Sequence, residues 1–216
     1  MSFTRAHRRP VGTVLAIAAA LALAGCSGGA GASTPAPTET VTTTATPTPT
    51  PTPTPTSTGP DLADPASWIV SFTGLGPIEV GAPMEGTASF MTAFTVAMQE
   101  ACPWVTAYAA DGLPSVWLPD PQSTGVVGQI VLQAWGGPAA AAVAASPKTA
   151  EGVGVGSTLE ELRAAYPALT EQQGKYAVFY AVTDDAGHWI NFSVTDDLVD
   201  GIVVRDEAKI DSEYCG

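Results

Sequence analysis

The sequence predicts an α+β fold with two tandem repeats, each a helix followed by three strands, forming one antiparallel sheet with helices packed on one face. Three observations lead to this prediction. After residue 61, short runs rich in valine, isoleucine and aromatic residues alternate with turn residues. An apolar pattern with helical spacing precedes these runs in each half. The order of the segments then recurs about 75 positions later, which indicates a duplication.

The N-terminus has the features of an export signal. A basic stretch with Arg5, Arg8 and Arg9 precedes an apolar run at 11–24, which is too short to span a bilayer. The pair Arg8-Arg9 leaves both general secretion and twin-arginine export open.

The segment Leu23-Ala24-Gly25-Cys26 resembles the lipobox of bacterial lipoproteins. The resemblance implies a signal peptide at 1–25 and cleavage before Cys26. It also implies a diacylglycerol thioether on Cys26, with fatty acids such as palmitate as the membrane anchor. The alternative is an ordinary secretory signal cleaved near Ala24. With lipid attached, the protein is expected on the extracytoplasmic face of the cell membrane.

A stalk is expected at 26–60. Residues 33–58 are mostly threonine, proline and alanine, and residues 46–56 alternate strictly between threonine and proline. This composition lacks the large apolar residues needed for a core and favours extended polyproline, at about 3.1 Å per residue. The stalk is therefore predicted to be a disordered spacer, with threonines that are potential acceptors of O-linked sugars.

The chain after Cys26 is strongly acidic, with five of the eight basic residues and all 21 acidic ones. This charge makes nucleic acid and anionic surfaces poor partners. Cys102 and Cys215 form an even pair in an oxidising compartment, which predicts a disulfide; a reactive thiol or a metal pair is the alternative. A single histidine after the signal argues against a zinc site of the usual kind. No metal or cofactor is expected.

The folded domain is expected at 61–216, with repeat one at about 61–145 and repeat two at about 146–216. Repeat one contains a helical pattern at 84–98, weakened by Gly86 and several threonines. Its three strands are expected at 104–109, 115–118 and 126–132.

Repeat two shows the pattern more clearly. Ser157 or Thr158 is suited to cap a helix that Pro167 ends, and Glu160-Glu161 suit its first turn. Aspartate turns separate the three strands, which are expected at 176–183, 188–194 and 199–205.

The two halves share a Val-Gly loop followed by a hydrophobic-Glu pair, at 78–85 and at 153–160. Together with Tyr166-Pro167 and the strands to Val204, this pattern resembles the repeat of the β-lactamase-inhibitor protein fold and of SmpA/OmlA-type envelope lipoproteins. The resemblance implies a non-enzymatic lipoprotein that uses an open sheet face for contact. It does not imply β-lactamase inhibition, because no residue matches an inhibitory loop.

Alternation along the strands predicts which sheet face is free. Ile190, Phe192 and Val194 share one phase and are expected to pack on helices. Aromatic and amide side chains occupy the other phase, and aromatic anchors dominate contact energies. The alternative is that a loop, the N-terminal segment or residues 136–147 cover these rings. The candidate interaction face consists of Trp117, Gln129, Gln133, Trp135, Trp189 and Asn191.

Other motifs predict ordinary structure. The glycines at 152–156 lack the lysine of a phosphate loop and indicate a turn. His188 near Asp184 lacks a nucleophile elbow and is expected to be a hairpin residue. Asp196-Asp197 lack the ligand spacing of a calcium loop.

The main functional hypothesis is a lipid-anchored, non-catalytic interaction module whose partner is an envelope protein or a cell-wall ligand. The alternatives are a secreted cell-envelope enzyme and a purely structural envelope lipoprotein. An enzyme would need a pocket with convergent polar groups. No catalytic residues are expected.

Overall fold

The computed structural model describes residues 59–98, 102–134 and 143–215, and most of their regular structure is strand. All of them belong to the second of the chain's two structural units, Thr54–Gly216. The predicted signal peptide, Cys26, most of the stalk and Trp135 lie outside the described residues.

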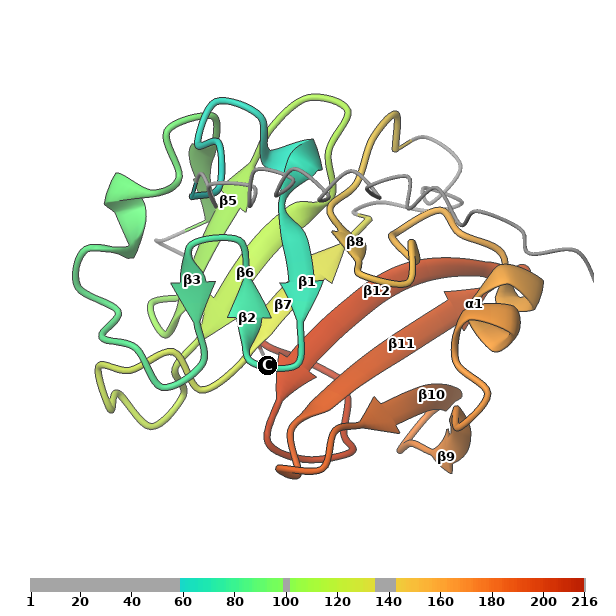
Figure 1. Ribbon diagram of the computed structural model, residues 1–216. Coiled ribbons are helices and arrows are strands. Elements are labelled where there is room, and N and C mark those ends of the chain that lie inside the picture. The colour runs from blue at the N-terminus through green and yellow to red at the C-terminus, as the bar shows by residue number, and fades with distance from the viewer. Residues whose placement is uncertain (1–58, 99–101, 135–142, 216) are drawn as a thin grey trace, which may run out of the picture. The chain divides into compact units, whose positions relative to one another are not determined.

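Eight of the described strands form one antiparallel sheet, in the order β4-β5-β6-β7-β12-β11-β10-β9 (Figure 1). Two four-strand meanders therefore meet where β7 pairs with β12. The strands are β4 (Thr95–Met98), β5 (Val105–Ala109), β6 (Ser115–Pro119), β7 (Ile130–Gln133), β9 (Thr170–Gln173), β10 (Val178–Thr183), β11 (Trp189–Thr195) and β12 (Leu198–Arg205).

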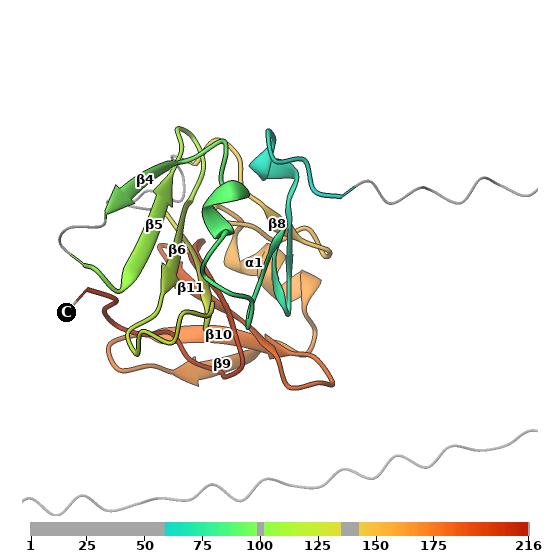
Figure 2. The ribbon, with the colours of Figure 1, turned by 90° about the vertical axis from the view of Figure 1, so that its left-hand side faces the viewer.

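A second, smaller sheet has the order β3-β2-β1-β8, with β1 and β8 parallel. Figures 1 and 2 show it on the same side of the large sheet as α1, while the C-terminal segment lies on the other side. The bounds of these elements, with two short 3-10 helices, are β1 (Ile69–Ser71), β2 (Gly74–Leu75), β3 (Ile78–Glu79), β8 (Lys148–Thr149), α1 (Leu159–Ala165), η1 (Pro65–Ser67) and η2 (Thr87–Ser89).

The predicted α+β fold with two helix-plus-three-strand repeats is wrong. The expected helix at 84–98 is replaced by η2 and by strand β4. Gly86 adopts a left-handed φ of 94°, and β-branched residues such as Thr95 and Val96 favour a strand over a helix. Each meander has four strands instead of three, and the small sheet, which the sequence analysis missed, covers much of the face assigned to helices.

Helix α1 was predicted at the right place, and its start is explained by its cap. The Thr158 hydroxyl accepts a hydrogen bond from the Glu161 amide, and the Glu161 carboxylate accepts one from the Thr158 amide. The helix buries Leu162 in the core. Among the residues that the structure describes, no helix is both long enough and apolar enough to cross a membrane.

The main core lies between the small sheet with α1 and one face of the large sheet, here called the core face. Strand register aligns one row of core-face residues across the sheet, because directly paired residues point to the same side. This row consists of Tyr108, Val116, Leu132, Ile202, Phe192 and Tyr180.

The two halves also use similar backbone hydrogen bonds to hold the loop that precedes η2 or α1. In the first half, the Gly81 amide donates to the Val127 carbonyl oxygen at 2.7 Å. In the second half, the Gly156 amide donates to the Val199 carbonyl oxygen at 2.8 Å. Both glycines have positive φ, at 85° and 92°. The origin of the halves by duplication stays a prediction.

Candidate functional site

The C-terminal segment 206–215, here called the strap, lies against the face of the large sheet opposite the core face. We call this second face the strap face. Ile210 and Tyr214 of the strap pack on a small cluster of buried side chains contributed by the β4–β5 connection and by strands β5, β6, β7 and β12. The members of this cluster are Cys102, Val105, Ala107, Trp117, Val131 and Val203.

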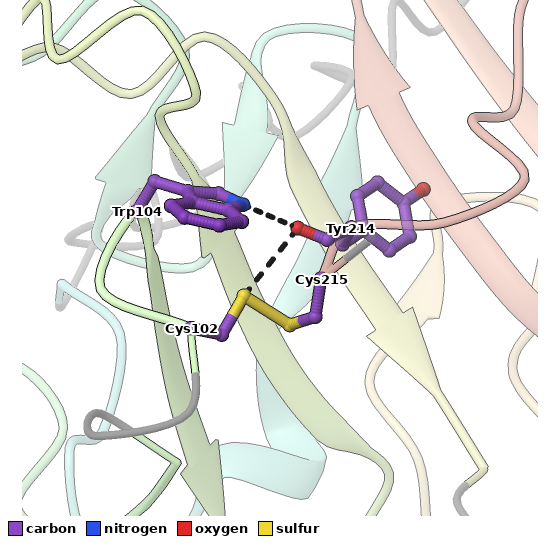
Figure 3. The surroundings of a disulfide bond; sticks show 4 residues. All are labelled: Cys102, Trp104, Tyr214 and Cys215. Atoms are coloured by element: carbon purple, nitrogen blue, oxygen red, sulfur yellow. Dashed lines mark hydrogen bonds between the residues drawn. A yellow bond between two sulfur atoms is a disulfide. The ribbon is translucent and has the colours of Figure 1, made fainter.

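A disulfide fixes the end of the strap, and it confirms the predicted pairing of Cys102 with Cys215. The two Cα atoms are 5.4 Å apart, and 113 positions separate the cysteines in the sequence. Figure 3 shows Trp104 beside this link, with its indole Nε1 donating to the Tyr214 carbonyl oxygen at 2.7 Å. The strap end is therefore held by a covalent bond and by a hydrogen bond that also orients the Trp104 ring.

Asn191 holds the beginning of the strap. Its side-chain amide donates to the carbonyl oxygens of Val203 and Glu207, each at 3.2 Å. Its side-chain oxygen accepts from the Lys209 backbone amide at 3.0 Å. Asn191 is fully buried, and these bonds pair the polar atoms of its side chain.

Charged side chains connect the middle of the strap to the sheet. Arg205 donates to Asp211 at 2.8 Å, to the side-chain oxygen of Gln129 at 3.0 Å, and to Glu207. Lys209 adds an ion pair with Asp211 at 2.7 Å. Burial alone would raise the pKa of Asp211, but hydrogen bonds from Lys209, Arg205 and Gln129 hold it below its usual range. Asp211 is therefore ionised at neutral pH.

The loop between β6 and β7 is held by Asp120. Its carboxylate accepts hydrogen bonds from the backbone amides of Gly125 and Thr124, each at 2.8 Å, and from the Thr124 hydroxyl at 2.9 Å. The Gly125 amide contributes most to lowering the pKa of Asp120, followed by the Thr124 amide. The loop has a fixed shape because its own carboxylate anchors it.

A groove of about 810 Å³ separates this loop from the strap. We call it the Trp104 groove. The groove is lined by the Asp120 loop and by the strap. Gln129 and Arg205, which are hydrogen-bonded to each other, also line it. Trp104 lines it and is 37% exposed as a residue, which makes it one of the larger exposed hydrophobic residues in the described chain. Ligand pockets commonly have volumes of about 300–1,000 Å³.

A second hollow, of about 550 Å³, lies on the other side of the strap. Trp117 and Gln133 line it. Ser193 and Asp200 line it too, and the Ser193 hydroxyl donates to the Asp200 carboxylate at 2.6 Å. Of its two aromatic residues, Trp117 is only 5% exposed and Tyr214 is half-buried.

The structure places the described members of the predicted interaction face on the strap face but does not leave them open. Trp117, Gln129 and Asn191 are buried, because the strap covers them. Trp189 and Gln133 are half-buried, and Trp135 lies outside the described residues. The expected free sheet face is therefore corrected to a covered one, and the covering segment is the C-terminal tail, which the sequence analysis did not consider.

Trp104 was identified only as a strand residue from the sequence, although it is the aromatic ring that the groove presents. Its position two residues after Cys102 was the available signal. The predicted disulfide brings the C-terminal tail to Cys102, and therefore also to Trp104.

His188 and Asp184 form a pair at the β10–β11 hairpin. The His188 Nδ1 atom lies 2.9 Å from an Asp184 carboxylate oxygen, which raises the pKa of the imidazole and lowers that of the carboxyl. No three His, Cys, Asp or Glu side chains in the described ranges are grouped as metal ligands.

No family model, curated protein or solved structure matches this chain. The resemblance to the β-lactamase-inhibitor protein repeat and to SmpA/OmlA lipoproteins therefore stays a prediction from the sequence.

Proposed function

We propose that the protein is a non-catalytic binding module, anchored by lipid on Cys26 to the extracytoplasmic face of the cell membrane, and that the Trp104 groove is its binding site. The observation that carries the proposal is the Trp104 ring. It is exposed in a groove of ligand size, and its orientation is fixed by the hydrogen bond to the strap. A pre-oriented aromatic ring loses little conformational entropy on binding.

The sequence supports the location of the module. The lipobox-like segment ends at Cys26, and the threonine-proline stalk follows directly. An extended stalk of this composition separates the folded unit from the bilayer and lets the groove contact material beyond it. The tether thereby gives the groove a high local concentration of envelope ligands.

The anchor is tested by Cys26→Ser. Without the thiol, the lipid has no attachment point, so the variant should move from the detergent phase to the aqueous phase, or remain unprocessed. Unchanged partitioning of a processed variant would contradict lipid attachment.

Binding is tested with isolated cell envelopes and the chain expressed from residue 27 with its disulfide formed. The protein should sediment with the envelopes, and Trp104→Ala should weaken this association about tenfold, as loss of an aromatic anchor does. Tyr176→Ala is the matched control, because Tyr176 is 69% exposed at the β9–β10 hairpin and lies outside the groove. Equal sedimentation of Trp104→Ala and the unchanged chain would refute the groove as the binding site.

A further inference from the structure

We propose that the Trp104 groove binds an uncharged carbohydrate chain of the cell envelope. This inference rests on the function proposed above and adds the chemical class of the ligand.

The Trp104 ring presents an apolar face while its polar edge is occupied. The indole N–H donates to the Tyr214 carbonyl oxygen, so it is not available to a ligand. The indole can therefore contact a ligand only through its apolar ring surface. Sugar rings have apolar C–H faces that stack on such surfaces, and their hydroxyl groups require polar partners around the edge.

The groove supplies these polar partners beside the ring. Gln122, Ser212 and Glu213 are exposed and line the groove, and they offer amide, hydroxyl and carboxylate groups. The Asp120 oxygen that accepts from Gly125 has a further lone pair. Hydroxyl groups both donate and accept hydrogen bonds, so a sugar can satisfy this mixed set, whereas an apolar ligand would leave the groups unpaired.

The charges of the groove disfavour an anionic ligand. Its two cationic side chains, Arg205 and Lys209, are already paired with Asp211 and Glu207 of the strap. An anionic ligand would have to break these pairs and would also meet the acidic surface of the whole chain. Asp120 in turn is held by backbone amides and a hydroxyl, which reduces its attraction for a cation.

The open form of the groove suits a segment of a polymer better than a small ligand that must be enclosed. Several of its lining residues are exposed, among them Gln122 and Thr124 on the loop side and Ser212 and Glu213 on the strap side. Both walls are fixed, one by Asp120 and the other by the disulfide and Asn191. A fixed, open groove binds a segment of a polymer without a closing movement.

The test uses isolated envelopes that have been treated in two ways before the chain from residue 27 is added. Protease digestion removes envelope proteins, and periodate oxidation cleaves the vicinal diols of sugars. We expect binding to survive protease treatment and to be lost after periodate. We also expect it to persist in 1 M NaCl, where the screening length is about 3 Å, because a neutral ligand makes no ion pairs.

Variants separate stacking from support of the strap. Both Trp104→Ala and Trp104→Phe remove the N–H donor, but only Trp104→Phe keeps an aromatic ring. If the ring stacks on sugar, Trp104→Phe should bind several-fold more tightly than Trp104→Ala, with Tyr176→Ala unchanged. Equal losses in the two Trp104 variants would show that the residue only supports the strap, and would overturn the proposal.

The remaining outcomes distinguish this inference from the function on which it rests. Binding that depends on Trp104 but is lost after protease and survives periodate would replace the carbohydrate by a protein partner. Trp104-dependent binding lost in 1 M NaCl would replace the neutral ligand by a charged one. Binding that does not depend on Trp104 would refute the proposed groove itself.

Discussion

The two faces of the large sheet are covered in different ways. On the core face, 21 buried side chains from the small sheet, α1, the large sheet and their connections form one cluster. On the strap face, six buried side chains and two residues of the strap form a much smaller one. Hydrophobic burial is therefore sufficient to hold the core face closed, whereas the strap face depends on a disulfide and on polar contacts. The strap should consequently be separable from the rest of the fold.

The largest loss of stability is expected from a substitution on the core face. Phe192 is fully buried in the row of core-face residues, between Ile202 and Tyr180, and its ring centroid lies 5.7 Å from that of Tyr166. Phe192→Ala should lower the free energy of unfolding by about 3–5 kcal/mol, since it removes an aromatic side chain from a packed core. Denaturant unfolding measures this, with Tyr176→Ala as the exposed control. A loss no larger than that of the control would mean that this face is not the main core.

Removal of the disulfide should lower the free energy of unfolding by less than this, and the large sheet should stay folded. The link closes a loop with a sequence separation of 113. Cys102→Ala combined with Cys215→Ala should lower the free energy of unfolding by about 2–4 kcal/mol, mainly because the unfolded chain becomes less constrained. The thermal midpoint should fall while the far-ultraviolet signal of the sheet is retained. Loss of the sheet signal at room temperature would show that the two faces are not independent.

Asn191 should contribute to the free energy of unfolding mainly while the strap covers it. Asn191→Ala removes its bonds to Glu207 and Lys209, which should cost about 1–3 kcal/mol where the groups stay buried. In a Cys215→Ser background the cost should be smaller, because a released strap lets water reach these groups. A double-mutant cycle measures this coupling. Equal costs in both backgrounds would contradict a releasable strap.

The smallest expected effect is a change in the pH dependence of stability, caused by the Asp211 carboxylate. The pKa of Asp211 is lowered in the folded protein, so its ionised form contributes stability above the ordinary value of 3.8, and this contribution is lost as the pH falls below it. The stability difference between the unchanged chain and Asp211→Asn should therefore shrink between neutral pH and pH values below 3.8. A difference independent of pH would mean that the Asp211 charge does not hold the strap.

The contrast between the core face and the strap face also explains how much of the structure could be predicted from the sequence. Strands β5, β6, β10, β11 and β12 and helix α1 were predicted within a few residues, because alternation, turn residues and a helix-capping residue are local signals. The helix expected at 84–98 was wrong because tertiary pairing of β4 with β5 outweighed a weak helical pattern. The small sheet was missed because its strands are only two or three residues long.

The candidate site was less predictable, since it depends on a contact between distant segments. Residues 206–215 contain few apolar side chains, and nothing in their local pattern indicates that Ile210 and Tyr214 pack on the sheet. The predicted pairing of Cys102 with Cys215 contained this information. It required the tail to cross from the end of β12 to the beginning of β5, and therefore to cover Trp117 on the way.

Hydrogen exchange tests the separability of the strap most directly. Amide exchange would be compared between the oxidised chain and Cys215→Ser under native conditions. The Lys209 amide, which donates to Asn191, should lose protection in the variant, while amides in β11 and β12 that pair with each other remain protected. This result would show a strap that opens over an intact sheet. Equal loss of protection in the strap and in β11 and β12 would contradict the account, because it would show that both faces open together.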